Sequence, residues 1–287
     1  MLNLMYITND PAVARIAEAN GVDRIWVDME FIGKSARQGG MDTVQLHHTV
    51  DDIRVIRAAV SKAEVLVRVN PIHEATADYG DSAWEIPAAI DAGADVVMLP
   101  FFKTADEVKT FLKLVGGRAK TMLLVETPEA AERIDEILAL EGIDEVHIGL
   151  NDLSLGYGMK FMFQLLADGT VERLCLKCRE KGIPYGFGGI AALGKGMLPA
   201  ERVIREHYRL GSTRAILSRS FCNTSLVADP AEIERIFRTG MAEIRALEAE
   251  CAAHAPEDAY FTENQHQVEL AVKIIHAGIV EREQYST

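Results

Sequence analysis

The chain has 287 residues, 48% of them hydrophobic and 25% charged, which is typical of a globular protein with room for one large α/β barrel or two small domains. It carries 30 Lys and Arg against 43 Asp and Glu, a formal net charge of −13, which disfavours nucleic acid and anionic membranes as partners because both attract cations. The N-terminus has no signal-peptide pattern, and no apolar stretch approaches the roughly 20 residues that cross a bilayer, so we expect a cytoplasmic protein.

Strand and helix patterns alternate along most of the chain. The predicted strands are near-continuous apolar runs at residues 4–8, 24–30, 65–70, 95–101, 121–126, 145–150, 184–188 and 213–218. The predicted helices cover residues 12–20, 50–61, 83–92, 104–115, 128–140, 171–181, 199–209 and 232–252. Eight β/α units in about 250 residues match the usual size of a (β/α)8 TIM barrel. Strands that are apolar throughout are expected in such a fold because both of their faces are buried.

The alternative fold is a doubly wound open sheet. The strand count and the absence of a dinucleotide-binding motif disfavour it. A further helix is predicted at residues 267–279, beyond the eighth unit. We therefore expect an α/β barrel domain at residues 1–255 and a C-terminal helical extension at 256–287. Such an extra helix often packs on a neighbouring subunit, which predicts a homo-oligomer.

Two short patterns resemble other kinds of site but do not complete them. Cys175 and Cys178 form a C-x-x-C inside a helical pattern, and without a second Cys or His pair we expect reduced thiols rather than zinc. Residues 189–196 nearly match a P-loop, but Gly196 stands where that motif needs a metal-binding hydroxyl, so nucleotide hydrolysis is disfavoured.

Carboxylates follow two of the predicted strands. In a β/α barrel the catalytic residues lie at the carboxyl ends of the strands, where Glu126 and Asp152 occur. Oxygen ligands suit Mg²⁺ or Mn²⁺, with Co²⁺ as a further candidate, so the two side chains are predicted metal ligands. The alternative is that Glu126 caps the helix beginning at Pro128 and that Asp152 is a turn or capping residue.

Charged residues also mark the ends of the second and third strands. Arg68 lies inside an apolar strand, where a charge is rarely buried without a partner. It could bind a carboxylate or stabilise an enolate oxygen, or form an ion pair with Asp28, Glu30 or Glu126, and these roles are compatible. Asp28 and Glu30 are predicted to orient Arg68 or metal-bound water. The alternative for both is helix capping or surface exposure.

The loop after the second strand places cations among glycines. Lys34 and Arg37 could clamp an anionic substrate, or the loop could simply be solvated. His47 and His48 follow, and either could act as acid/base because imidazole titrates near neutral pH, or both could be exposed. The other predicted substrate-binding residues at strand ends are Asn70, Asn151 and Arg219.

Taken in order, these segments resemble a known enzyme family. The pieces are Gly21–Glu30, Val67–Asn70, Ala92–Pro100, Val125–Thr127 and Gly149–Ser154. Over roughly residues 4–225 the chain resembles the metal-dependent 2-oxo acid aldolase and citrate lyase β-subunit-like family, which includes 4-hydroxy-2-oxo-heptanedioate aldolase, in the phosphoenolpyruvate/pyruvate barrel superfamily.

The resemblance implies specific roles. Glu126 and Asp152 would be the metal ligands, and Arg68 would bind the enolate and carboxylate. Backbone N–H groups near Gly149, Leu150 and Asn151, with Ser154, would surround the substrate carboxylate. The barrel would assemble through its C-terminal helix into a dimer-based oligomer, commonly a hexamer.

Two positions depart from the pattern of that family. Phe31 stands where the aldolases usually have a histidine, and Leu124 stands where they often have glutamine. The acid/base is therefore expected from His47, His48 or a metal-bound water. The predicted function is a class II, metal-dependent carbon–carbon lyase acting on a 4-hydroxy-2-oxo acid through a pyruvate enolate. The alternatives are a CoA-ester lyase of the citrate or malyl-CoA type and a barrel subunit without catalysis.

Overall fold

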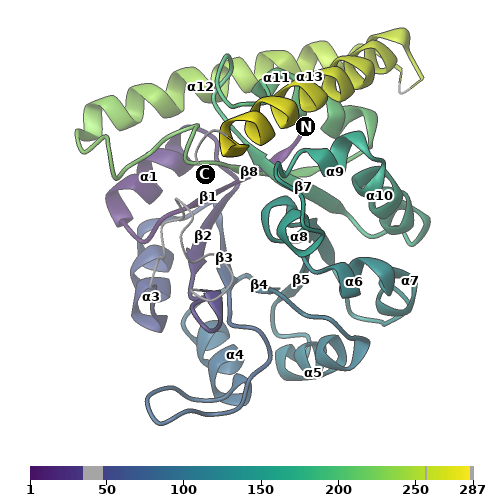
Figure 1. Cartoon of the computed structure of the whole chain (residues 1–287). Helices are drawn as coiled ribbons and strands as arrows, with labels where there is room; N and C mark the ends of the chain where they lie inside the picture. The colour runs from purple at the N-terminus through teal and green to yellow at the C-terminus, as the bar shows by residue number, and fades with distance from the viewer. Residues whose placement is uncertain (35–47, 256, 285–287) are drawn as a thin grey trace. The chain divides into compact units, whose positions relative to one another are not determined.

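The computed structural model describes residues 1–34, 48–255 and 257–284. Within them, eight strands alternate with helices and follow one another in sequence order around a closed barrel (Figure 1), which confirms the predicted TIM-barrel fold. The strands are β1 (Asn3–Ile7), β2 (Arg24–Asp28), β3 (Glu64–Arg68), β4 (Val96–Leu99), β5 (Lys120–Val125), β6 (Glu145–Ile148), β7 (Tyr185–Ile190) and β8 (Arg214–Leu217).

Helices follow the strands in each β/α unit. They are α1 (Pro11–Ala19), α3 (Val50–Ala59), α4 (Ser82–Asp91), α5 (Ala105–Val115), α6 (Pro128–Glu132), α7 (Ile134–Ile137), α8 (Leu150–Gly156), α9 (Gln164–Ala167), α10 (Thr170–Glu180), α11 (Ala200–Arg209), α12 (Pro230–Ala252) and α13 (Ala259–Gln284). None in the described part of the chain is long and apolar enough to cross a membrane.

The chain divides into two compact units. The first unit is Leu4–His147, and the second unit is Ile148–Thr287 together with Met1–Asn3. In the first unit, β1 to β5 pair in parallel, and every residue of β2 and β4 is buried. The register of β2 and β3 makes Asp28 and Arg68 Cα partners. Residues that end neighbouring parallel strands are thereby brought to the same edge of the sheet.

Local sequence signals set the helix starts of the first unit. Thr49 and Asp52 form a reciprocal capping box at α3, and Thr104 and Glu107 form another at α5. Thr127 caps α6, which has proline in its first turn. The predicted helix at 128–140 is instead two short helices, because the backbone leaves helical geometry at Arg133 (φ −95°, ψ 16°).

A buried ion cluster lies at the opposite, amino-terminal ends of the strands in the first unit. Arg24 at the start of β2 donates from Nε to Glu64 at 2.7 Å and from its two Nη atoms to Glu145 at 2.5 and 2.7 Å. These three residues begin β2, β3 and β6 and so tie the strands together at that end. At this end of a β/α barrel, charged clusters serve stability rather than catalysis.

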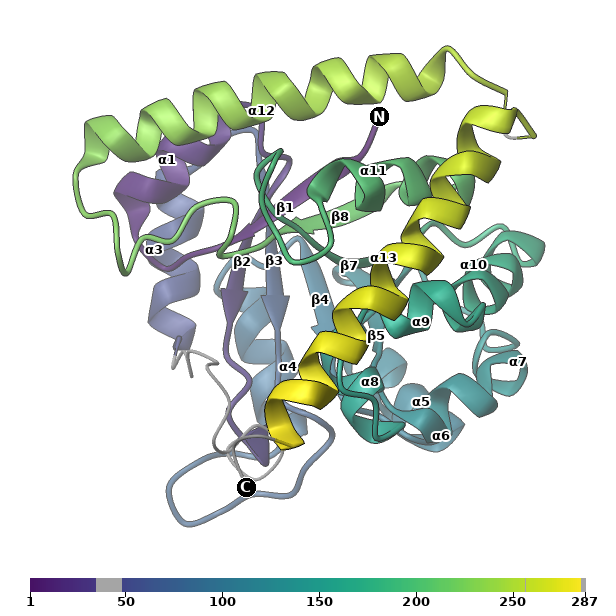
Figure 2. The ribbon, with the colours of Figure 1, turned by 45° about the horizontal axis from the view of Figure 1, so that its top comes forward.

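In the second unit, two long helices follow the last strand. Asp229 caps α12, which has proline in its first turn, and α12 runs for 23 residues. The predicted helix at 267–279 is longer than expected, since α13 spans 26 residues. It packs against α9 and α11 (Figure 2), and its Val268 and Val272 side chains are buried. The strand predicted at 145–150 ends at Ile148, and Leu150 begins α8 after Gly149.

Candidate functional site

A buried charge cluster occupies the carboxyl ends of β2 and β3. It consists of Asp28, Glu30, Lys34 and Arg68, and is called the Asp28 cluster below. Arg68 donates from Nε and Nη2 to the two oxygens of Asp28, both at 2.7 Å, and its Nη1 lies 3.2 Å from Glu30 Oε2. The Asp28 and Glu30 side chains are 2% and 1% exposed. Arg68 therefore forms the ion pairs that were one of its two predicted roles.

Lys34 completes this cluster from the loop after β2. Its Nζ lies 2.9 Å from Asp28 Oδ2 and 3.8 Å from Glu30 Oε2. The same Oδ2 atom accepts from Arg68, so one carboxylate oxygen holds two cations. Lys34 is therefore buried against protein carboxylates rather than solvated, and its predicted contact with an anionic substrate stays a prediction.

The electrostatics of the cluster follow from burial and charge. Burial alone would raise the pKa of Asp28, but the charges and hydrogen bonds of Arg68 and Lys34 outweigh it and hold that pKa well below its usual value. Burial would lower the pKa of Arg68, but the charges of Asp28 and Glu30 raise it further above its ordinary value. Both groups are therefore permanently charged at neutral pH. The Arg68 guanidinium also lies 5.0 Å from the ring centroid of Trp26.

His48 is tied to the backbone of this cluster. Its Nδ1 accepts a hydrogen bond from the Asp28 N–H at 2.9 Å, which leaves the proton of the neutral ring on Nε2. Burial lowers the pKa of His48, although the charges of Asp28 and Asp52 oppose that shift. The ring is therefore a neutral donor in this arrangement. His47 and Arg37, the other predictions in this segment, lie outside the described residues.

Asn70 fixes the backbone that carries the cluster. Its Oδ1 accepts from the N–H groups of Phe31 and Ile32, both at 2.9 Å. Its Nδ2 donates to the Met29 carbonyl at 3.3 Å and to Glu85 Oε1 at 2.7 Å. An amide has two donors and two main acceptor positions, so these bonds use its whole capacity. These bonds fix the backbone at Met29, Phe31 and Ile32, and the substrate-binding role of Asn70 stays a prediction.

The sequence analysis does not predict a role for Glu85, although it is a carboxylate between the apolar residues Trp84 and Ile86 of α4. It is fully buried and also accepts from the Asn70 N–H and, at 2.9 Å, from the Tyr79 hydroxyl. Burial raises the pKa of Glu85. Its position among apolar helix residues was the available signal, because a buried carboxylate needs partners.

Glu126 follows β5 and is only 4% exposed. Its Oε1 accepts the Phe101 N–H at 3.0 Å. Phe101, with φ 49°, is the one residue other than glycine with positive φ in the described ranges. That conformation costs about 1–3 kcal/mol and persists at functional sites where surrounding structure enforces it. The backbone after β4 is thus held in a strained state that directs a donor at Glu126.

Asp152 belongs to the second unit and lies in the first turn of α8. It is 7% exposed, and its Oδ1 accepts from Asn151 Nδ2 at 3.1 Å. Ser154 donates to the Asn151 carbonyl at 2.7 Å. Gly149 precedes the helix and Leu150 is its first residue. Arg219, also in this unit, is exposed in the turn after β8.

Each unit contains a cavity lined by described residues. The first, of about 510 Å³, is lined by residues that include Phe31, His48, Arg54, Tyr79 and Trp84. The Tyr79 ring meets Phe31 and Trp84 edge-on, with centroids 5.0 and 5.5 Å apart. Phe31 and His48 connect this aromatic cavity to the Asp28 cluster, since the Phe31 N–H donates to the Asn70 side chain and His48 Nδ1 accepts from the Asp28 N–H.

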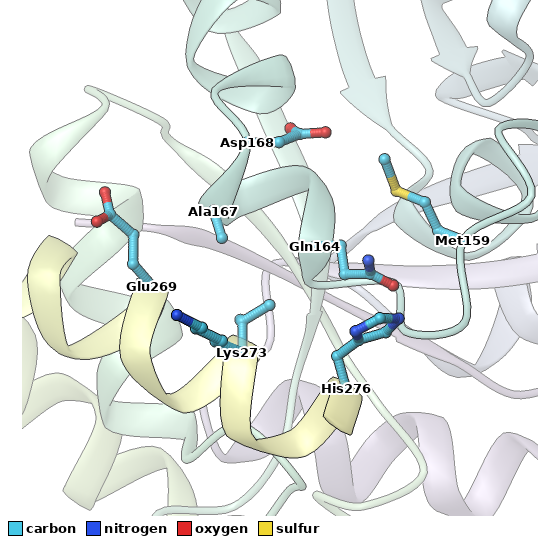
Figure 3. A pocket seen from close by; sticks show the side chains of 8 residues that line it. Met159, Gln164, Ala167, Asp168, Glu269, Lys273 and His276 are labelled. Atoms are coloured by element: carbon cyan, nitrogen blue, oxygen red, sulfur yellow. The ribbon is translucent and has the colours of Figure 1, made fainter. Parts of the chain in front are cut away.

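The second cavity, of about 230 Å³, lies between α9 and α13 (Figure 3). Figure 3 shows Glu269, Lys273 and His276 of α13 on one side and Gln164 and Asp168 on the other. None of the residues predicted to carry the chemistry lines it.

Comparisons with known proteins agree with this architecture. The model of the HpcH/HpaI aldolase/citrate lyase family matches residues 3–185. A 4-hydroxy-4-methyl-2-oxoglutarate aldolase of Chaetomium globosum is 33% identical over 76 residues, covering 26% of this chain and 28% of that protein. A hydroxypyruvate/pyruvate aldolase of Roseovarius nubinhibens is 24% identical over 171 residues, covering 49% of this chain and 65% of that protein. The matched part thus spans less than two thirds of either curated relative.

A solved structure shares the fold. A HpcH/HpaI aldolase/citrate lyase family protein from Burkholderia cenocepacia superposes with a TM-score of 0.59 at 18% identity, covering 85% of this chain and 94% of that one. At this identity the likeness shows the fold alone. The family match covers more than half of the chain, and both curated relatives are named as aldolases.

Proposed function

The chain belongs to the HpcH/HpaI aldolase/citrate lyase family, and we propose that it is a divalent-metal-dependent aldolase that cleaves or forms a 4-hydroxy-2-oxo acid through a pyruvate enolate. The observation that supports this most directly is Arg68, whose side chain is 12% exposed while its two carboxylate partners are buried. In the described residues, its bonds to Asp28 and Glu30 use three of the five N–H donors of a guanidinium. The two remaining N–H groups of Arg68 would donate to a substrate oxygen. The ion pairs would keep the guanidinium in position to stabilise the negative charge that develops on that oxygen.

The proposed metal ligands are Glu126 and Asp152. Each is a buried carboxylate, and hard divalent cations prefer oxygen ligands, so both side chains fit such an ion. Among the described residues there is no group of three or more His, Cys, Asp and Glu side chains that could hold a metal. As proposed ligands, the two carboxylates would leave other coordination positions of the ion to water and substrate oxygens, as is common for Mg²⁺ and Mn²⁺.

In the proposed reaction, each group has a separate role in the cleavage of the C3–C4 bond. The cation, when bound, would act as a Lewis acid on the 2-oxo acid. Arg68 donates hydrogen bonds to the enolate oxygen as its negative charge grows, while Asp28 and Glu30 keep the guanidinium in place. The aromatic cavity beside the Asp28 cluster offers room for the aldehyde half of the substrate, with Phe31, Tyr79 and Trp84 as its walls.

Proton NMR of pyruvate in D₂O tests this function. The metal-stripped protein should leave the methyl signal unchanged, and addition of Mg²⁺ or Mn²⁺ should cause its loss as protons exchange for deuterium. Glu126→Gln should abolish the exchange while the protein stays folded. Exchange that is independent of metal, or equal in the variant, would contradict the proposal. No exchange, together with binding of a CoA ester in a titration, would favour a CoA-ester lyase.

A further inference from the structure

The aromatic cavity beside the Asp28 cluster has the size and walls of a site for a small organic group. Its volume of about 510 Å³ lies within the usual range of ligand pockets, and Phe31, Tyr79 and Trp84 line it. The Tyr79 ring stands at 88° to the Phe31 ring and at 86° to the Trp84 ring. Rings arranged in this way present both faces and edges, which are the surfaces against which a further ring packs favourably.

Neighbouring groups hold these walls in place. The Tyr79 hydroxyl donates to the buried Glu85 at 2.9 Å. The Gly80 backbone lies directly against the Trp84 ring, since a Cβ atom at that glycine would come within 2.7 Å of Trp84 Cε3. Trp84 is nevertheless 49% exposed, and such a large apolar surface beside a cavity is typical of a ligand-binding groove. A ligand that binds between fixed rings loses little affinity to ordering the protein.

The polar groups of the lining are already engaged within the protein. Asp51 and Arg54 form an ion pair with each other, so their charges balance. The Thr49 hydroxyl donates to Asp52 in the capping box of α3. Burial lowers the pKa of His48, so this side chain is uncharged at neutral pH. The described residues that line the cavity therefore carry no net charge, which favours an uncharged apolar group over a carboxylate.

The cavity adjoins the groups that are proposed to act on the substrate. Phe31 directly follows Glu30, whose carboxylate lies 3.2 Å from Arg68. His48 accepts the Asp28 N–H at 2.9 Å. In the proposed reaction Arg68 binds the oxygen on C2, and C4 lies two bonds further along the substrate. A substituent on C4 that points away from Arg68 can thus extend into the aromatic cavity.

We propose that the aromatic cavity binds the substituent on C4 of the substrate, and that this substituent carries an uncharged aromatic ring. The proposal rests on the proposed function and names the class of its aldehyde. In cleavage the C3–C4 bond breaks, C4 becomes the carbonyl carbon of the ring-bearing aldehyde, and the C4 hydroxyl loses the proton that C3 gains to form pyruvate. Condensation joins the same two molecules without another product. Contact of the ring with Tyr79 and Trp84 removes apolar surface of all three from water.

Condensation of pyruvate with two aldehydes tests this class. Phenylacetaldehyde differs from acetaldehyde by a phenyl ring in place of one hydrogen, and kcat/KM for each is measured with Mg²⁺ and saturating pyruvate. We expect the wild type to prefer phenylacetaldehyde by at least about 10-fold, since a single methylene in an apolar pocket already changes kcat/KM by about 10–200-fold. Trp84→Ala should reduce this preference by at least about 10-fold. Loss of folded or metal-loaded enzyme lowers both rates equally and leaves their ratio unchanged.

The controls separate the remaining outcomes. Leu176→Ala, at an exposed apolar residue of α10, should keep the preference of the wild type. A preference that Trp84→Ala leaves intact would overturn the proposal. So would faster condensation with the anionic aldehyde 4-oxobutanoate that is lost in Arg54→Gln, since the cavity would then select a carboxylate. Methyl exchange of pyruvate without any preference for the ring would reject this aldehyde class alone, whereas absence of exchange would reject the proposed function as well.

Discussion

At the scale of single residues, Asp28 is the centre of the site. Its two oxygens accept three hydrogen bonds from the side chains of Arg68 and Lys34, and Oδ1 also lies 3.3 Å from the Glu30 N–H. The Asp28 carboxylate therefore orients two cations and does not act as a base. The energetic cost of burying these charges is compensated only while every partner is present.

Asp28→Asn should therefore be strongly destabilising. Two buried cations would keep only Glu30 as a charged neighbour within the cluster, and loss of one partner of a buried ion pair costs about 3–5 kcal/mol in the free energy of unfolding. The matched control is Asp51→Asn, which breaks the exposed pair with Arg54 and should cost at most about 1 kcal/mol. Urea denaturation of both variants measures the difference. Equal urea midpoints for the two variants would contradict the argument that the buried ion pairs of Asp28 stabilise the fold more than an exposed pair does.

The lowered pKa of Asp28 also predicts how stability depends on pH. The folded pKa lies below the unfolded value of about 4, so the stabilisation is complete above that pH and is lost as the pH falls toward the folded pKa. The unfolding free energy of the wild type should thus decrease between about pH 4 and pH 2. In Asp28→Asn the same decrease should be shallower by this contribution. If the free energy of unfolding depended on pH in the same way in both proteins, the ionisation of Asp28 would not contribute to the loss of stability at acid pH.

At the scale of secondary-structure elements, the sequence predicts the ends of strands better than it predicts loops. The ion pair of Asp28 and Arg68 could be predicted from the sequence, because both residues follow apolar strand residues and parallel strands bring their carboxyl ends together. The contact of Lys34 with Asp28 could not be predicted in this way, because the sequence of a Gly-rich loop does not indicate how its backbone runs. The role of Asn70 was also hidden, because its partners Phe31 and Glu85 are distant in the sequence.

The junction of β7 and α8 in the second unit offers a test at this scale. Gly188 has φ +52°, and a Cβ atom there would lie 2.8 Å from Leu150 Cδ1, in the first turn of the helix that carries Asp152. Gly188→Ala should cost about 1–2 kcal/mol for the backbone conformation and more for the displacement of Leu150. Gly169→Ala is the control, because Gly169 has φ +85° and open space around it, so only the backbone conformation should destabilise this variant. Thermal unfolding of both should show the larger loss at Gly188, and equal losses would contradict the close-packing argument.

At the scale of the whole molecule, the long helix α13 presents two apolar faces. One face buries Val268 and Val272 within the second unit. On the other, Leu270 and Ile274 are 47% and 64% exposed and lie one turn apart. Large exposed apolar residues at this spacing commonly mark a contact surface. The homo-oligomer predicted from the extra helix would bury this pair against a second copy of the chain.

The double variant Leu270→Glu with Ile274→Glu tests that prediction. Two carboxylates cannot be desolvated in an apolar contact without a large penalty, so the variant should shift toward monomer at a protein concentration where the wild type is associated. Multi-angle light scattering after size-exclusion chromatography measures the mass of each species. Thr262→Glu, on an exposed position of the same helix, is the control and should leave the mass unchanged. A wild type that is monomeric at high concentration, or an oligomer that survives both substitutions, would show that α13 does not form the subunit contact.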